Sequence, residues 1–264
     1  MGGITVAPAA QVNGAKPLIV RPRHANQGAI ALTDHKTCLI AGCGYLGRRA
    51  AAHWLAAGCS VSAITRSADR AKEFRDQGIE PVVTDLSDPT STTSLPPADI
   101  VLWAVGFDRS ASSREAIWLD GLRRFVDALP APPQRFLYVS STSVYGDQEG
   151  DAITESTAPA PATEGGRCCW QAETLLRERL APHPQTHVTV LRMAGIYGPD
   201  RLLRRVDDLR NQQPLPGSAE QWLNLIHVDD GVRAIDWAAT TADPPSPKLL
   251  IHRLLHDVTD WCPC

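Results

Sequence analysis

The sequence predicts an α/β fold in which a doubly wound parallel sheet is followed by a small C-terminal lobe. From residue 37 onward, short apolar runs alternate with stretches of helical periodicity, as strands joined by crossover helices do. The run at 100–105 is apolar on both faces, which is typical of a central strand in a parallel sheet. The first apolar run enters a glycine turn, and a helical pattern leaves that turn.

The glycine turn reads Gly42-x-Gly44-x-x-Gly47, and this layout is typical of the Rossmann-type fold that holds a dinucleotide. Gly42 permits the turn, Gly44 lets the backbone approach a pyrophosphate, and Gly47 lets the helix pack closely on the strand. The helix N-terminus adds free N–H groups and a partial positive charge. Glycine turns are common, but the strand before this one and the helix after it favour a dinucleotide site.

The other elements follow in chain order and are bounded by turn residues. Gly58 and Gly78 close the first two helices, and Pro130 ends the long third helix because proline cannot continue one. Asp229 and Asp230 are expected to cap the N-terminus of the last helix. The expected strands are 38–41, 60–65, 80–84, 100–105, 135–140 and 187–192, and the expected helices are 46–57, 67–76, 113–129, 166–180 and 231–239.

Composition indicates a globular protein and excludes several functions. The 264 residues are 43% apolar and 21% charged, with a net charge of −3, so we expect neither nucleic acid nor a membrane as a partner. No apolar run approaches the length that crosses a bilayer. Seven cysteines without metal-finger spacing indicate free thiols in a reducing cytoplasm, and we expect no metal.

The chain divides into three expected segments. Residues 1–36 are rich in Ala, Gly and Pro and lack sustained periodicity, which predicts a flexible N-terminal extension. Residues 37–200 are the expected NAD(P)-binding Rossmann domain, and residues 201–264 the expected small substrate lobe. The familiar pattern stops near Thr241, so we interpret the end of the lobe as atypical or truncated.

Two arginines after the second strand bear on the choice of cofactor. Arg66 stands where this fold meets the adenosine ribose. An acidic residue there favours NAD, whereas Arg66 offers charge and donors to a 2′-phosphate, and Arg70 is one helical turn further on. NADP is therefore the predicted cofactor and NAD the alternative, although arginines at strand ends are often simply solvated. Asp85 closes the third strand and either accepts from the adenine amino group or caps the following turn.

Five short motifs occur in register between residues 37 and 240: Gly42-Cys-Gly-Tyr-Leu-Gly47, Asp85-Leu86, Ser140-Ser-Thr-Ser-Val-Tyr-Gly146, Leu191-Arg-Met-Ala-Gly-Ile-Tyr-Gly-Pro199 and Ile226-His-Val-Asp-Asp230. Together they resemble the extended short-chain dehydrogenase/reductases, and more narrowly the NAD-dependent epimerase/dehydratase group that acts on nucleotide sugars. The resemblance implies that Ser141 hydrogen-bonds the reacting substrate oxygen. The cofactor-binding residues that it and the fold imply are Gly42, Gly44, Tyr45, Leu46, Gly47, Arg66, Asp85, Leu86, Ala104 and Ser140.

The sequence departs from this family at the catalytic Tyr-x-x-x-Lys pair. Counting back from Glu173, which matches a helix glutamate of the family, the tyrosine position falls on Gly165 and the lysine position on Cys169. No lysine occurs between Lys72 and Lys248, so no small shift of register restores the pair. The chain resembles an atypical subgroup that keeps the cofactor site and lacks the proton-transfer pair.

Two functions remain open from the sequence. Ser141 could orient a carbonyl while Tyr145 or Tyr197 replaces the missing acid, although a tyrosine without a nearby cation is a poor base at neutral pH. The expected partner is then a small-molecule substrate, with a nucleotide sugar as the candidate. The alternative is a non-catalytic NADP(H)-binding sensor or regulatory module. A homodimer of the kind common in this family is also expected. The arginines that could meet a substrate phosphate are Arg201, Arg204 and Arg205.

Overall fold

The computed structural model describes residues 36–90, 94–106, 113–146, 152–201, 210–211, 224–244 and 246–250. Nearly all of the extension expected over 1–36 and much of the lobe expected over 201–264, with Arg204 and Arg205, lie outside these residues. The flexibility of the extension, the bounds of the lobe and the homodimer therefore stay predictions. Within the described residues, no helix is long and apolar enough to cross a membrane.

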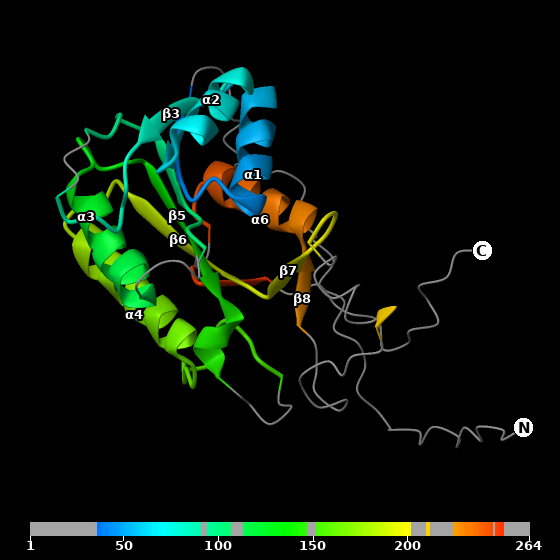
Figure 1. Cartoon of the computed structure of the whole chain (residues 1–264). Helices are drawn as coiled ribbons and strands as arrows, with labels where there is room; N and C mark the ends of the chain where they lie inside the picture. The colour runs from blue at the N-terminus through cyan, green and yellow to red at the C-terminus, as the bar shows by residue number, and fades with distance from the viewer. Residues whose placement is uncertain are drawn as a thin grey trace, which may run out of the picture.

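The main sheet has seven strands in the order β3-β2-β1-β4-β5-β6-β9 (Figure 1), and every neighbouring pair is parallel. The strand order reverses between β1 and β4, where a doubly wound sheet binds its ligand. The predicted α/β fold of the Rossmann type is confirmed. The strands are β1 (Thr37–Ala41), β2 (Ser60–Thr65), β3 (Glu80–Val83), β4 (Ile100–Trp103), β5 (Arg135–Ser141), β6 (His187–Met193) and β9 (Lys248–Leu250).

Helices cover both faces of this sheet. Figure 1 shows α1 and α6 on one face and α3 and α4 on the other. Side chains alternate along β1, so that Cys38 and Ile40 join the core that includes residues of α1 and α6, while Leu39 and Ala41 join the core that includes residues of α3 and α4. The α-helices are α1 (Tyr45–Ala56), α2 (Ala68–Asp76), α3 (Leu122–Asp127), α4 (Glu164–Leu180) and α6 (Val228–Thr240).

The long helix expected over 113–129 contains a π turn. Ser113 Oγ accepts a hydrogen bond from the Ala116 backbone N–H at 3.0 Å, which supports the start of the helix. The chain then forms the π-helical segment η1 (Ala116–Gly121) before it continues as α3. Hydrophobic periodicity does not distinguish a single π turn from the α-helix around it.

Two expectations about the last elements are wrong. His227, and not the Asp229-Asp230 pair, caps α6, because the imidazole Nδ1 accepts from the Asp229 backbone N–H at 3.3 Å. Both aspartates lie in the first helical turn, where the helix dipole favours negative charge. The familiar pattern also does not stop near Thr241, since β9 adds to the sheet beside β6. The atypical or truncated end of the lobe stays a prediction. A short parallel pair, β7 (Gly195–Tyr197) and β8 (Leu225–His227), was not predicted.

Candidate functional site

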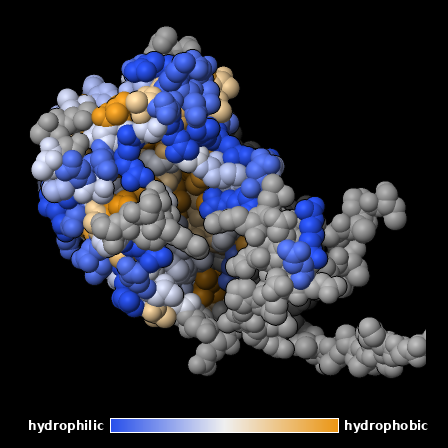
Figure 2. Space-filling view, in the orientation of Figure 1, coloured by the Kyte–Doolittle hydropathy of each residue, from blue (hydrophilic) through white to orange (hydrophobic). Residues whose placement is uncertain are grey.

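A cleft of about 460 Å³ lies where the first four strands of the chain end. Much of its lining comes from the residues that follow β1, β2, β3 and β4, at their carboxyl ends. Figure 2 shows hydrophobic residues in the depth of a hollow on this face, with hydrophilic residues on its rim. An apolar floor with a few polar groups at the edge is the usual form of a cofactor site.

The three glycines of the Gly42-x-Gly44-x-x-Gly47 turn have different structural roles. Gly42 has φ +89°, and a Cβ there would lie 2.4 Å from the Ala104 carbonyl oxygen. A Cβ on Gly47 would lie 2.4 Å from the Gly42 carbonyl oxygen. The fold itself therefore requires these two glycines. A Cβ on Gly44 would meet nothing within 4 Å, and Gly44 lines the cleft. Gly44 thus leaves room for a ligand, as the close approach of a pyrophosphate to the backbone requires.

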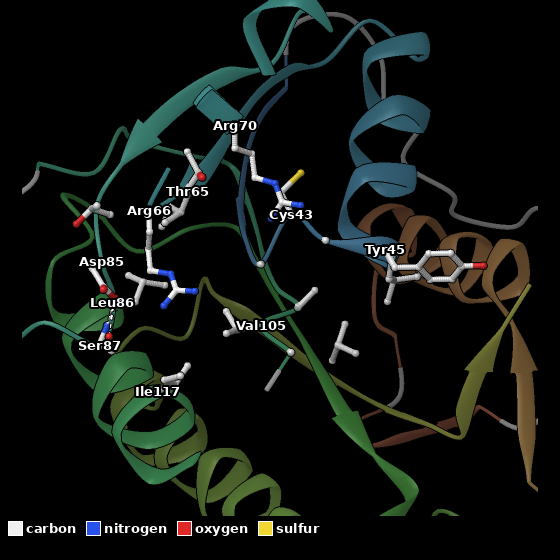
Figure 3. A pocket seen from close by; sticks show the side chains of 18 of the residues that line it. Cys43, Tyr45, Thr65, Arg66, Arg70, Asp85, Leu86, Ser87, Val105 and Ile117 are labelled. Atoms are coloured by element: carbon white, nitrogen blue, oxygen red, sulfur yellow. Dashed lines mark hydrogen bonds between the residues drawn. The ribbon is translucent and has the colours of Figure 1, made fainter. Parts of the chain in front are cut away.

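Charged side chains lie at the end of β2. Arg66 and Arg70 both line the cleft beside Thr65, and Figure 3 shows both extending toward its interior. Cys43 lies near Arg70 in the same view. Burial raises the pKa of the Cys43 thiol to about 11, an effect that Arg48 and Arg70 only partly offset. The thiol is therefore neutral at pH 7 and does not compete with an anion for the positive charge of the arginines.

Asp85 has the capping role considered from the sequence, and its contact with the adenine amino group stays a prediction. It lines the cleft, while its Oδ1 accepts from the backbone N–H and the hydroxyl of Ser87 at 2.8 and 2.6 Å. These hydrogen bonds cap the turn after β3 and hold the carboxylate in place. Of the other predicted cofactor residues, those that also line the cleft are Tyr45, Leu46, Leu86 and Ala104.

Gly47 and Ser140 are predicted cofactor residues that lie outside the cleft lining. The close approach of Gly47 to the Gly42 backbone makes it a packing residue between α1 and the glycine turn. Ser140 is 3% exposed, and its hydroxyl donates to Glu173 Oε1 at 2.7 Å. Their direct contact with a cofactor stays a prediction.

The predicted catalytic residues Ser141 and Tyr145 lie at the end of β5 and outside the lining of the cleft. Ser141 Oγ accepts from the Ser143 backbone N–H at 3.1 Å and so caps the short 3-10 helix η2 (Thr142–Tyr145). Tyr145 is 1% exposed, and its hydroxyl accepts from Arg192 Nη1 at 3.0 Å. No cation is close to this tyrosine along the chain, yet the fold brings Arg192 into contact with it.

Tyr197, the other candidate acid, is the last residue of β7. Its side chain is buried, and its ring packs edge-on against His227 with the centroids 5.1 Å apart. It does not line the cleft. Its role as an acid therefore stays a prediction.

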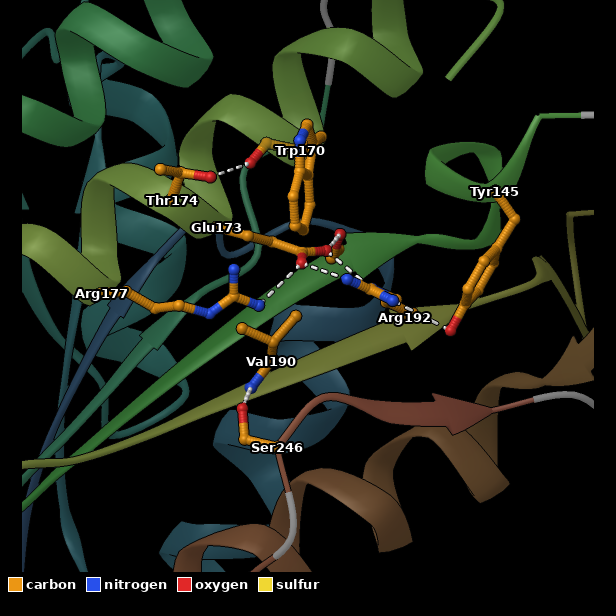
Figure 4. Close-up of polar contacts among 9 residues, drawn as sticks. Tyr145, Trp170, Glu173, Thr174, Arg177, Val190, Arg192 and Ser246 are labelled. Carbon is orange, nitrogen blue, oxygen red and sulfur yellow. Dashed lines mark hydrogen bonds and ion pairs between the residues drawn. The ribbon is translucent and has the colours of Figure 1, made fainter. Parts of the chain in front are cut away.

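A buried ionic cluster is the part of this region that sequence reasoning missed. Figure 4 shows Glu173 of α4 between Arg177 and Arg192, with Tyr145 at the far end of Arg192. Arg192 Nε and Nη2 donate to Glu173 Oε1 and Oε2 at 3.0 and 2.6 Å, a bidentate pair. Burial alone would lower the pKa of Arg192, but the hydrogen bonds to Glu173 and Tyr145 outweigh it and keep the guanidinium charged. The signal that could have found the cluster is an arginine inside the apolar strand at 187–193.

The positions expected for the family's catalytic pair hold no group that transfers protons at neutral pH. A Cβ on Gly165 would lie 3.7 Å from the Trp118 ring and 3.8 Å from Arg114 Nε, so those side chains lie beside that position. Cys169 is 6% exposed and packs with Val144. Burial raises the pKa of the Cys169 thiol to about 11, so this sulfur is not a thiolate nucleophile at neutral pH.

The sequence led us to expect free thiols and no metal site. The buried free thiols of the described residues are Cys38, Cys43, Cys59, Cys168 and Cys169. Cys262 and Cys264 lie outside the described residues. In the part of the chain that the structure describes, no group of three or more His, Cys, Asp or Glu residues is arranged to hold a metal ion.

The fold and the cleft together define a class, the Rossmann-type α/β proteins with a glycine turn after the first strand. Within it, residues 38–250 match the NAD dependent epimerase/dehydratase family. The chain belongs to this family. The match extends past Thr241 and includes the residues of β9, which agrees with the extent of the sheet.

Relatives and solved structures support the assignment. Protein YeeZ of Escherichia coli strain K12 is 30% identical over 206 residues, which are 76% of this chain and 72% of the relative. The structure of MoeE5 in complex with UDP-glucuronic acid and NAD is 25% identical, with a TM-score of 0.64 over 81% of this chain and 75% of that chain. A UDP-glucuronic acid 4-epimerase from Bacillus cereus in complex with NAD has a TM-score of 0.64 over 81% of this chain and 77% of that chain, and at 18% identity it shows the shared fold alone.

Proposed function

We propose that the protein binds NADP(H) in preference to NAD(H) and acts on a small carbonyl compound, with a nucleotide sugar as the candidate substrate. The observation that carries the proposal is the cleft itself, in which an open Gly44 and the two arginines Arg66 and Arg70 meet. The structure of the solved relative MoeE5 contains UDP-glucuronic acid and NAD, which supports a nucleotide sugar and a nicotinamide dinucleotide as ligands. The preference for NADP(H) rests on Arg66 and Arg70 alone.

In this proposal each part of the cleft has a separate task. The turn at Gly44 and the N-terminus of α1 hold the pyrophosphate. Arg66 and Arg70 hold the 2′-phosphate, and Asp85 faces the adenine. The bound dinucleotide supplies the hydride chemistry that protein side chains lack. Ser141 orients the substrate oxygen, as the family resemblance implies.

Replacing Arg66 tests the choice between the two dinucleotides. Arg66→Glu is expected to weaken NADPH binding about tenfold or more, because it places a negative charge beside the 2′-phosphate. NADH binding should be retained or improved, since a carboxylate there accepts from the ribose 2′-hydroxyl. The control is Arg75→Glu, an exposed residue of α2 outside the cleft lining. An unchanged ratio of NADPH to NADH affinity would show that Arg66 does not touch the 2′-phosphate.

A specific observation favours a second candidate, a non-catalytic NADP(H) sensor. Tyr145 is buried with its hydroxyl against Arg192, and Gly165 and Cys169 stand where the catalytic pair is expected. A protein with this arrangement can bind the dinucleotide and signal the state of the NADP(H) pool to a partner without turnover.

Turnover distinguishes the two candidates. The wild-type protein is assayed with NADPH on a panel of carbonyl compounds and nucleotide sugars, and any activity is compared with that of Ser141→Ala. The enzyme proposal expects a loss of about 100-fold in the variant, with NADPH affinity unchanged as the control for folding. Saturable NADPH binding without turnover on any compound would support the sensor.

A further inference from the structure

Tyr45 connects the glycine loop to a turn far along the chain. It is the first residue of α1 and directly follows Gly44. Figure 3 shows its side chain pointing away from the centre of the cleft, toward β7. Its hydroxyl donates to the Pro199 carbonyl at 2.7 Å. Gly198 has φ +146°, and a Cβ there would lie 2.8 Å from the Tyr45 hydroxyl. The tyrosine therefore packs tightly against the turn that follows β7.

Two arginines pack on the ring of Tyr45. Arg49 lies with Cζ 4.1 Å from the ring centroid, and its guanidinium donates to the Tyr45 carbonyl at 2.9 Å. Arg201 lies with Cζ 4.9 Å from the same centroid. Both distances are within the range of cation–π attraction. The ring thus holds the guanidinium of Arg201 near the start of α1.

The backbone of the turn directs Arg201 to this place. The Arg201 backbone N–H donates to the Gly198 carbonyl at 3.2 Å, which closes the turn. Asp200, between them, has φ +66°, a left-handed conformation that aspartate tolerates better than most residues. Arg201 is exposed and lines the same cleft as Gly42 and Gly44. The ion pairs found among the described residues do not include Arg201.

We propose that Arg201 binds the pyrophosphate of the dinucleotide and that Tyr45 is the residue that positions it. A guanidinium matches the geometry of phosphate oxygens and carries its charge at every physiological pH. Arg201 adjoins Tyr45 at the glycine loop, whereas Arg66 and Arg70 come from the end of β2 and the start of α2. The cleft thus has separate cationic groups for the pyrophosphate and for the 2′-phosphate. The inference rests on the proposed binding of NADP(H), and it assigns Arg201 to the cofactor rather than to a substrate phosphate.

Two fragments of the cofactor distinguish the proposed roles of these cationic groups. ADP carries the pyrophosphate without a 2′-phosphate, and adenosine 2′-monophosphate carries the 2′-phosphate without a pyrophosphate. Calorimetric titration of the full-length protein should show that Arg201→Gln weakens binding of ADP and NADPH about tenfold or more and leaves adenosine 2′-monophosphate unchanged. Arg66→Gln should show the opposite selectivity. Arg233→Gln is the control, because this exposed arginine of α6 has the same charge and lies outside the cleft lining.

Variants of Tyr45 test its role as a positioning residue. Tyr45→Leu removes the ring on which Arg201 packs, so it should reproduce the selective loss of ADP affinity. Tyr45→Phe keeps the ring and removes only the hydrogen bond to Pro199, so its loss should be smaller. A merely structural role of Tyr45 would lower the affinity for both fragments alike.

The outcomes distinguish this inference from the proposed function. Wild-type protein that binds NADPH, together with an Arg201→Gln variant that binds ADP as tightly as wild type, would overturn the role of Arg201 alone. Equal losses for both fragments in Arg201→Gln would also overturn it, because they would indicate a disturbed turn rather than a lost phosphate contact. Wild-type protein that binds neither NADPH nor ADP would overturn the proposed function and the inference together.

Discussion

Gly44→Asp is expected to weaken dinucleotide binding by about 100-fold or more while the protein stays folded. Gly44 is the N-cap residue of α1, with φ −94° and no side-chain capping bond. A Cβ at this position would meet nothing within 4 Å. Aspartate is a favoured N-cap residue, so the free energy of unfolding should change by no more than about 1 kcal/mol. The same side chain would fill the space for the pyrophosphate and would repel its charge.

Two further variants separate the causes of this loss. Gly44→Asn has nearly the same size without the charge, so the difference between Asn and Asp measures electrostatic repulsion. Ala52→Asp adds the same charge to an exposed position of α1 and should leave binding unchanged. Calorimetric titration with NADPH and thermal unfolding of each variant provide both readouts. Retained NADPH affinity in a folded Gly44→Asp protein would contradict the assignment of the glycine loop.

Glu173→Gln is expected to lower the free energy of unfolding by about 3 kcal/mol or more. Glu173 is fully buried and holds Arg192, which is 2% exposed, by two hydrogen bonds. The amide of glutamine offers one acceptor oxygen and no charge, so the Arg192 guanidinium would remain buried without its counter-ion. Ser140 would lose its charged acceptor at the same time.

The control for Glu173 is a neighbour on the same helix. Glu178→Gln changes an exposed carboxylate of α4, and its effect should remain within about 0.5 kcal/mol. Chemical denaturation of both variants measures the difference. Equal stability of Glu173→Gln and wild type would show that the buried pair contributes nothing to the fold. In the folded fraction of Glu173→Gln, NADPH affinity should be retained, because Glu173 lies outside the cleft lining.

The main elements of the fold were predictable because their signals are local. The apolar runs and the glycine turn indicated β1 to β6, and the helical periodicity indicated α1, α2, α4 and the body of α6. The three-residue strands β7, β8 and β9 were missed because they are too short for periodicity. The pairing of β9 with β6 depends on contacts between distant segments, which no local pattern records.

The cleft and the ionic cluster also differ in whether their signals are local in the sequence. The cleft was predictable because glycine spacing and the residues at strand ends lie in short segments of sequence. The ionic cluster was not, because it depends on the register that places Ser140 opposite Arg192 and on the helix that brings Glu173 to both of them. The contact between Tyr45 and Arg201 likewise needs the turn after β7 to fold back on the start of α1.

The binding of NADP(H) in this cleft is tested most directly by calorimetric titration of the purified full-length protein with NADPH and, separately, with NADH. We expect saturable binding of NADPH that is about tenfold or more tighter than that of NADH, because Arg66 and Arg70 meet the 2′-phosphate. Equal affinities for NADPH and NADH would contradict the contact of these arginines with the 2′-phosphate. They would not contradict the assignment of the glycine loop to the pyrophosphate. The absence of binding for both dinucleotides would show that this cleft does not hold NADP(H).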